Sequence, residues 1–134
     1  MVSTIITQVV GREYLYCTNQ PENQMKKLVI LGAGTAGTMM ANKLYRNLNQ
    51  DVWEITIVDK DENHYYQPGF LFIPFGIYQP EEVIRPKREF LPKGVKFLID
   101  NVQKIEGEQN QVVLASGTVL PYDILVVATG AVPV

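Results

Sequence analysis

The chain has 134 residues, of which 46% are hydrophobic and 19% charged, enough for one compact core and too few for two domains. Its 12 basic and 14 acidic residues are scattered and leave a formal net charge of −2 at pH 7. No basic stripe therefore marks it for nucleic acid or an anionic membrane surface. Cys17 is the single cysteine and His64 the single histidine, which excludes an intrachain disulfide and a cysteine-rich metal site and favours a reducing cytoplasm.

The first ten residues, MVSTIITQVV, have neither the positive region nor the long apolar region of a secretory signal. No run in the chain approaches the ~18 apolar residues of a membrane span, so neither export nor spanning is expected. Because residues 1–10 are rich in β-branched side chains, we expect a strand there that packs on the domain or on a second copy.

A strand, a helix and a second strand are predicted next. Residues 27–31 are a short apolar run without alternation, typical of a strand buried on both faces of a parallel sheet. From Thr35 to Leu48 apolar residues recur at helical spacing, which predicts an amphipathic helix. Residues 53–58 form a second β-rich run that stops at Asp59. Together these elements have the size of a right-handed βαβ unit.

The middle of the chain mixes aromatic residues with chain-breaking ones. Residues 65–78 contain two prolines and two glycines among three phenylalanines, which predicts a packed, buried loop with a helical turn. Residues 81–90 are expected to form a short helix interrupted at Pro86. Residues 95–99 predict a third strand of the same sheet.

Short strands and turns alternate in the last third of the chain. A β-meander is predicted for three segments, residues 102–105, 112–114 and 119–120. Residues 124–128, Ile-Leu-Val-Val-Ala, are wholly apolar, and we interpret them as a central strand of the parallel sheet.

The segment Gly32-Ala33-Gly34-Thr35-Ala36-Gly37 has the pattern G-x-G-x-x-G, after a predicted strand and at the start of a predicted helix. Gly32 permits a tight turn, Gly34 has no side chain to block a pyrophosphate, and Gly37 lets helix and strand pack closely. The unpaired N–H groups and the dipole of the helix start favour phosphate. A dinucleotide-binding loop is therefore predicted; a glycine-rich loop that serves only as a tight turn is the alternative.

Asp59 follows Gly37 by 22 residues (59 − 37). This is close to the ~20-residue spacing of the carboxylate that binds an adenosine ribose. Because its charge would repel a 2′-phosphate, the spacing indicates FAD or NAD rather than NADP. A solvated carboxylate at the end of a strand is the alternative. Residues 25–134 are accordingly expected to form one dinucleotide-binding domain, and residues 1–24 an N-terminal extension.

Further along, residues 122–130, Tyr-Asp-Ile-Leu-Val-Val-Ala-Thr-Gly, resemble the second FAD signature of pyridine nucleotide-disulfide-reductase-like flavoproteins. Within that superfamily, residues 64–74, His-Tyr-Tyr-Gln-Pro-Gly-Phe-Leu-Phe-Ile-Pro, most resemble sulfide:quinone oxidoreductases and the flavoprotein subunit of flavocytochrome c sulfide dehydrogenase. The resemblance runs from about Lys26 to Val134. It implies an α/β fold, a truncated Rossmann-like FAD/NAD(P)-binding domain whose parallel sheet is joined by a β-meander.

The same resemblance implies which residues bind FAD. Those that would meet the pyrophosphate are Gly32, Gly34, Thr35, Ala36 and Gly37. Those near the adenosine, and where the chain crosses the cofactor, are Asp59, Lys60, Val102 (by main chain), Thr129 and Gly130. Pro68 and Gly69 would approach the flavin, unless the aromatic loop is simply core.

Members of the resembled family oxidise sulfide through redox cysteines and FAD and pass the electrons to quinone. Their cysteines and membrane-touching segments follow the strand that ends at Thr129-Gly130 and have no counterpart in this sequence. We therefore expect the chain to be inactive alone and to bind FAD weakly or not at all. Peripheral membrane contact is expected only of a full-length parent. Cys17 lies in the unmatched extension and receives no catalytic role.

Two other functions are compatible with these residues. One is a non-catalytic Rossmann module that binds a nucleotide or assembles into a homo-oligomer, which an exposed sheet edge would favour. The other is a type II NADH dehydrogenase or a ferredoxin-reductase-like flavoprotein, which shares both FAD signatures. Nucleotide preference and flavin content distinguish the first alternative from a fragment of a flavoenzyme. Reduction of the flavin by sulfide would distinguish a sulfide:quinone oxidoreductase-like parent from the second alternative.

Overall fold

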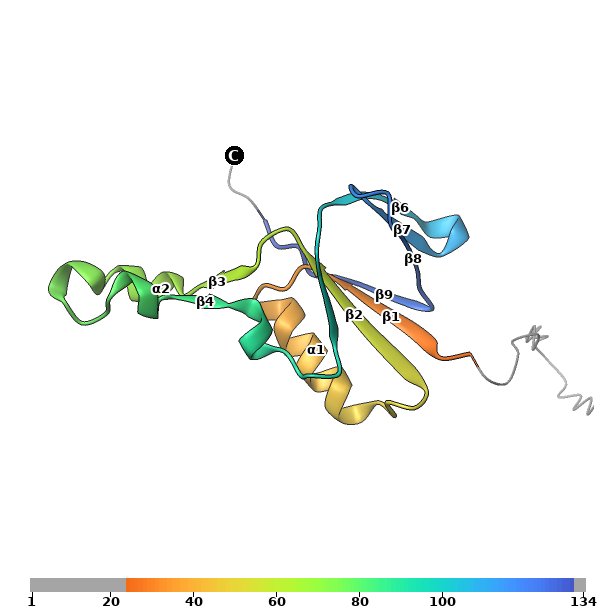
Figure 1. Cartoon of the computed structure of the whole chain (residues 1–134), viewed down its shortest axis with the longest axis horizontal. Coiled ribbons are helices and arrows are strands. Elements are labelled where there is room, and N and C mark those ends of the chain that lie inside the picture. Colours follow the sequence, from red (N-terminus) through yellow and green to blue (C-terminus); the bar gives the residue numbers. More distant parts are fainter. Residues whose placement is uncertain (1–23, 132–134) are drawn as a thin grey trace, which may run out of the picture.

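The computed structural model describes residues 24–131 (Figure 1). A four-stranded parallel sheet with the order β5-β2-β1-β9 lies at its centre. Its strands are β1 (Lys26–Leu31), β2 (Trp53–Asp59), β5 (Lys96–Ile99) and β9 (Ile124–Val127). Helix α1 (Thr35–Asn47) covers one face and a three-stranded antiparallel sheet covers the other. This arrangement is the predicted α/β fold.

Strand β1 is buried from both sides. Leu28 and Ile30 belong to the core cluster under α1, whereas Val29 and Leu31 belong to the cluster under the antiparallel sheet. Successive side chains of a strand point to opposite faces, so both parities must be apolar when both faces are covered. The prediction of a doubly buried strand is confirmed, and Ile30 has 0% of its surface exposed.

The predicted β-meander is also present. Its strands are β6 (Val102–Glu106), β7 (Gln111–Leu114) and β8 (Val119–Pro121), paired antiparallel in that order. Both turns use the left-handed conformation, with φ of 51° at Asn110 and 87° at Gly117, where asparagine and glycine are tolerated best. Val112 and Leu114 of β7 are buried against the central sheet.

The prediction of a central position for the last strand is wrong. Strand β9 pairs with β1 and forms one edge of the parallel sheet in the described part of the chain. Its residues Leu125 and Val126 pack against the two opposite clusters, while Ile124 and Val127 are exposed. A continuous apolar run indicates that both faces of the strand are covered. It does not indicate whether the strand has a neighbour on each side within the sheet.

The segment between β2 and β5 forms an arm that projects from the sheet (Figure 1). Strands β3 (Asn63–Tyr65) and β4 (Ile84–Pro86) pair antiparallel at its base, and the arm between them holds α2 (Gln67–Phe70) with 3₁₀ turns at Ile73–Phe75 and Pro80–Glu82. A third 3₁₀ turn, Lys87–Phe90, leads back to the sheet. The helix predicted for residues 81–90 is therefore wrong. Pro86 disfavours helical geometry at Arg85, which pairs instead with β3.

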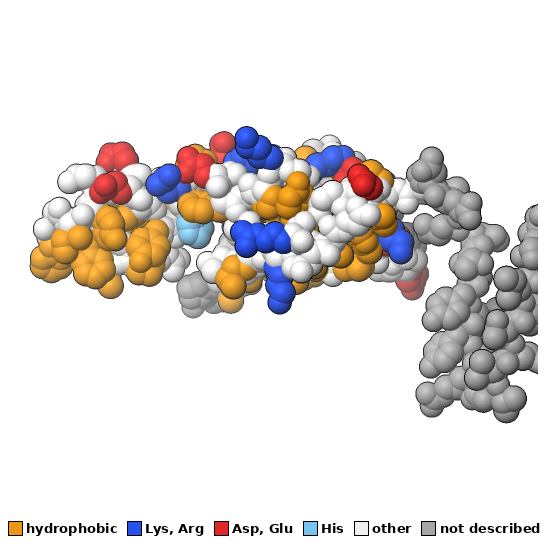
Figure 2. Space-filling view, turned by 90° about the horizontal axis from the view of Figure 1, so that it is seen from below, with side chains coloured by type: hydrophobic (Ala, Val, Ile, Leu, Met, Phe, Trp, Pro, Cys, Tyr) orange, Lys and Arg blue, Asp and Glu red, His pale blue; other side chains and the backbone are white. Residues whose placement is uncertain are grey.

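Burial of the aromatic loop was predicted as well, and only its helical turn is confirmed. Leu71 and Phe75 are 73% and 78% exposed, and Figure 2 shows hydrophobic side chains gathered at the end of the molecule that the arm forms. Phe72 and Tyr66 pack edge-to-face on Tyr78, with ring centroids 6.3 Å apart in each pair. The aromatic side chains thus contact one another at the arm rather than joining the main core.

The strand predicted for residues 1–10 lies outside the described residues, and the division of the chain after residue 24 stays a prediction. None of the helices within residues 24–131 is long and apolar enough to cross a membrane.

Candidate functional site

The glycine loop follows β1 at the carboxyl end of the parallel sheet. Gly32 has a φ of 97° and donates its N–H to the carbonyl of Val58 at 2.7 Å. A Cβ at this position would collide with the carbonyl of Ala128 and lie 2.9 Å from the Cα of Thr129. The turn therefore requires glycine twice over, for its left-handed backbone and for its close packing on the segment after β9.

The other two glycines of the motif differ in their surroundings. A Cβ at Gly37 would collide with the carbonyl oxygen of Gly32, so this glycine is needed for the close packing of helix and loop. A Cβ at Gly34 would meet no atom of residues 24–131 within 4 Å. Gly34 is the N-cap of α1, and no side chain in the described part of the chain caps this helix end. The first N–H groups of α1 thus have no side-chain cap among residues 24–131, and the space beside Gly34 is open, as an anion site at a helix start requires.

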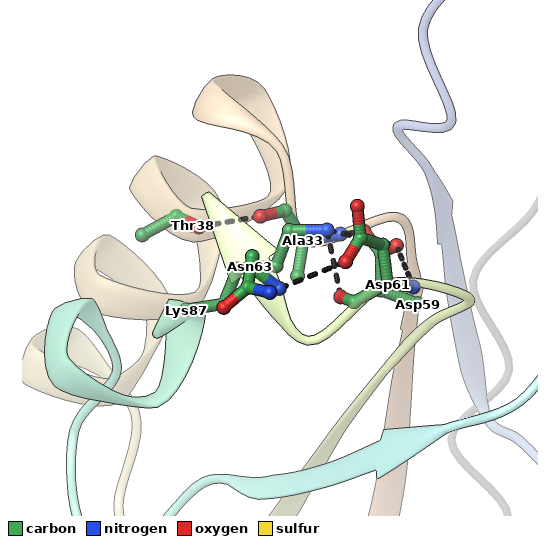
Figure 3. A network of polar contacts seen from close by, with 6 residues as sticks. All are labelled: Ala33, Thr38, Asp59, Asp61, Asn63 and Lys87. Atoms are coloured by element: carbon green, nitrogen blue, oxygen red, sulfur yellow. Dashed lines mark hydrogen bonds and ion pairs between the residues drawn. The ribbon is translucent and has the colours of Figure 1, made fainter. Parts of the chain in front are cut away.

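Asp59 ties the glycine loop to the end of β2 (Figure 3). Its Oδ2 accepts a hydrogen bond from the N–H of Ala33 at 2.6 Å, and its Oδ1 accepts one from the N–H of Asp61 at 3.0 Å. The ammonium of Lys87 lies 2.9 Å from the same Oδ1. Burial alone raises the pKa of Asp59, but the bonds from Asp61, Lys87 and Ala33 and the positive charge of Lys87 outweigh it. The pKa lies below its usual value, and the carboxylate is charged.

Local hydrogen bonds support this network. The hydroxyl of Thr38 donates to the carbonyl of Ala33 at 3.1 Å, and Oδ1 of Asp61 accepts from the N–H of Asn63 at 2.9 Å. The second contact is an aspartate turn of the kind that competes with regular structure after a strand. The loop and the turn after β2 are thus held in one arrangement by side chains of both.

Three adjoining clefts surround the glycine loop. The loop cleft, of about 480 Å³, is lined by Gly34, Thr35, Ala36 and the ends of β2 and β9. The meander cleft, of about 330 Å³, shares Gly32, Asp59, Lys60, Thr129 and Gly130 with it and reaches Val102. The arm cleft, of about 440 Å³, shares Gly34, Thr35, Asp61 and Lys87 with it and reaches His64, Tyr66 and Pro68. The shared residues join the three into one groove.

Nine of the ten predicted cofactor-binding residues line this groove: Gly32, Gly34, Thr35, Ala36, Asp59, Lys60, Val102, Thr129 and Gly130. Gly37 is buried beneath the loop and does not line it. Of the two residues expected near the flavin, Pro68 lines the arm cleft, while Gly69 is buried against Tyr66 and Val83. That any of these residues binds a cofactor stays a prediction.

Several groove residues escaped the sequence-based prediction. Asp61 and Asn63 come directly after a predicted strand, where aspartate and asparagine turns are common, and this signal could have identified them. Lys87 had no such signal. It lies 28 residues after Asp59 (87 − 59) in a segment expected to be helical, and the pairing of β3 with β4 brings it to the groove.

Comparison with known proteins gives the family. The pyridine nucleotide-disulphide oxidoreductase family matches residues 26–134. The mitochondrial sulfide:quinone oxidoreductase of Dictyostelium discoideum is 35% identical over 104 residues, covering 78% of this chain and 23% of the relative. The type II NADH:quinone oxidoreductase of Staphylococcus epidermidis is 36% identical over 108 residues, covering 80% of this chain and 27% of the relative.

A solved structure agrees with these relatives. The sulfide:quinone oxidoreductase from Aquifex aeolicus has a TM-score of 0.66 and 29% identity, and the match covers 78% of this chain and 24% of that one. The chain spans about a quarter of the length of the relatives it matches. The predicted resemblance and the Rossmann-like fold are both confirmed. The chain therefore belongs to the pyridine nucleotide-disulphide oxidoreductase family, whose members are oxidoreductases expected to bind FAD.

Proposed function

We propose that residues 26–134 bind the ADP half of FAD within a sulfide:quinone oxidoreductase-like flavoprotein. In this proposal the parent protein oxidises sulfide through redox cysteines and passes electrons to quinone. When bound, the flavin supplies the electron-transfer chemistry, and the protein supplies binding and orientation. The observation that carries the proposal is the groove, because its three clefts meet at a glycine loop set at the carboxyl ends of β1 and β2.

The shape of the groove suits an elongated dinucleotide. The loop cleft would take the pyrophosphate, on the N–H groups that follow Gly34. The meander cleft would take the adenosine, with Asp59 and Lys60 near the ribose and the main chain of Val102 near the adenine. The arm cleft would then face the flavin half, beside Pro68. In open α/β sheets ligands bind at the carboxyl ends of the strands, which is where the three clefts lie.

Gly34 provides a test of fit from the structure itself. Gly34 lines both the loop cleft and the arm cleft, so a larger side chain at this position would extend into the open space of these clefts. Its backbone is extended, with φ of −73° and ψ of −167°, a conformation open to any residue. Glycine is thus not required here for folding, and space for a ligand is the remaining reason for it.

The reductant of the parent has two candidates. Similarity to the Dictyostelium and Aquifex sulfide:quinone oxidoreductases and the aromatic segment at residues 64–74 support sulfide. The 36% identity to the Staphylococcus epidermidis enzyme supports NADH as the second candidate. Both relatives are quinone oxidoreductases by name, so quinone is the acceptor in either proposal.

The experiment is a calorimetric titration of the purified chain with ADP, FAD and NAD. We expect saturable binding of ADP and at most weak binding of FAD. The affinity for ADP should fall about tenfold or more in Gly34→Val, because the new side chain would occupy the pyrophosphate position. Gly107→Val is the matched control: a Cβ at Gly107 also meets no atom of the described residues within 4 Å, and this residue lies on the meander away from the groove.

Two outcomes would contradict the proposal. Equal loss in Gly34→Val and Gly107→Val would mean that the glycine loop is not the binding site. If the wild-type chain binds none of the three nucleotides at millimolar concentration, the non-catalytic self-assembling module becomes the better hypothesis.

A further inference from the structure

Lys87 is a buried cation in the middle of the groove. It begins the 3₁₀ turn that follows β4 and is 7% exposed. Its Nζ lies 2.9 Å from Oδ1 of Asp59 and donates to the carbonyl of Asp61 at 2.8 Å, and its backbone N–H donates to the carbonyl of Glu62 at 2.8 Å. Main chain and side chain are thus both attached to the turn after β2.

The ammonium of Lys87 retains capacity for a ligand. A lysine ammonium has three N–H donors, and within residues 24–131 Asp59 and Asp61 account for two of them. Lys87 lines both the loop cleft and the arm cleft, together with Gly34 and Thr35. The third N–H of the ammonium is therefore left for a ligand at the place where the loop cleft and the arm cleft join.

Charge in the groove points to the same role. The lining contains three carboxylates, those of Asp59, Asp61 and Asp100, and two cations, Lys60 and Lys87. Lys60 lines the meander and loop clefts, so Lys87 is the cation at the arm side of the glycine loop. Without Lys87, a diphosphate at Gly34 would lie near the uncompensated carboxylate of Asp59. A buried like-charge contact of that kind opposes binding.

We propose that Lys87 is a diphosphate-binding residue, which donates a charge-assisted hydrogen bond to the diphosphate of a dinucleotide and neutralises Asp59 beside it. This rests on the proposed function, since it names a further residue of the same site. The ligand chemistry is a nucleoside diphosphate ester. The bond to phosphate predicts an effect on ligands that carry phosphate and none on the nucleoside alone.

The test measures the affinities of ADP, AMP and adenosine by calorimetry, at low salt and at about 0.5 M salt. Lys87→Met keeps the length of the side chain and removes its charge. We expect ADP to bind about tenfold or more weakly, adenosine to change less than about twofold, and the salt dependence of ADP binding to decrease. Lys87→Arg should restore part of the ADP affinity. Lys96→Met is the control, because Lys96 is an exposed lysine paired with Glu54 outside the groove.

A second comparison covers loss of folding, since Lys87→Met leaves the buried carboxylate of Asp59 without its cation. The double variant Asp59→Asn/Lys87→Met removes both charges and is compared with Asp59→Asn alone. A further loss of ADP affinity in the double variant supports the proposal. The proposal is overturned if the double variant binds ADP as tightly as Asp59→Asn does, or if the affinities for ADP and adenosine fall equally. If the wild-type chain binds neither ligand, the proposed function fails as well, which is a separate result.

Discussion

In Gly37→Ala, the higher helix propensity of alanine is opposed by a steric collision with the glycine loop. Alanine in a helix interior is favoured over glycine by about 1 kcal/mol, so helix propensity predicts a more stable protein. In the structure, however, a Cβ at Gly37 would collide with the carbonyl oxygen of Gly32 and lie 3.5 Å from Cγ2 of Ile30. The colliding atom is backbone and cannot turn away. Such overpacking costs about 1–3 kcal/mol.

We expect the upper part of that range to apply, because the glycine loop is held by Asp59 and by its own bond to β2. The net loss for Gly37→Ala is then about 1–2 kcal/mol in the free energy of unfolding, or roughly 4–8 °C in Tm for a chain of this size. Thermal and urea unfolding followed by circular dichroism measure both quantities.

Gly34→Ala is the matched control, three residues earlier at the N-cap of the same helix. Its Cβ meets nothing within 4 Å, so its free energy of unfolding should stay within about 0.5 kcal/mol of the wild type. A Gly37→Ala variant as stable as the wild type, or more stable, would refute the packing argument and show that the loop can move away from the helix.

Three further predictions follow from burial and charge. Ile30→Ala should lower the free energy of unfolding by about 2–5 kcal/mol, measured by urea unfolding, because this side chain is fully buried under α1. Asp59→Asn should be less stable than the wild type at pH 7, and the difference in the free energy of unfolding should narrow as pH falls below about 4. Because the pKa of Asp59 is lowered in the folded protein, its charged carboxylate stabilises the fold above the unfolded-state pKa of about 3.9. This stabilisation is lost when the carboxylate is protonated. A gap that stays constant from pH 7 to pH 3 would contradict this. Because Leu71 and Phe75 are exposed on the arm, we expect the chain to associate as its concentration rises, and Leu71→Glu/Phe75→Glu to reduce this association without lowering Tm. Light scattering measures the association, and equal scattering from variant and wild type would contradict this role of the arm.

The parts of the fold that the sequence predicted are those with local signals. The apolar run of β1, the helical spacing of α1 and the glycine pattern between them lie within a short stretch of chain, so period and turn chemistry suffice to recognise them. The turns of the meander are similarly marked by Gly117 and Asn110. The glycine pattern and the spacing to Asp59 located the loop part of the groove, and the family resemblance implied the other residues that line it.

The errors arose where the outcome depends on distant segments. The edge position of β9 depends on which strands pair, and its apolar sequence is the same in either case. The aromatic residues of the arm predict burial of their side chains. Whether they are buried in the main core depends on the position of the arm relative to the sheet, which the local sequence does not determine. Pro86 was read as a helix break, whereas the pairing of β4 with β3 made it the end of a strand.

By itself the sequence determined the βαβ unit, the glycine loop at the carboxyl end of β1 and the meander, because each depends on spacing along the chain. The family was indicated by the resemblance of residues 64–74 and 122–130. Only the tertiary structure decided that Asp59 and Lys87 meet at 2.9 Å and that Asp59 holds the loop through Ala33. A charge pair between residues 28 positions apart has no periodic signature. It forms because the arm returns beside β2, and this return is set by the pairing of β3 with β4 and by the burial of the core as a whole.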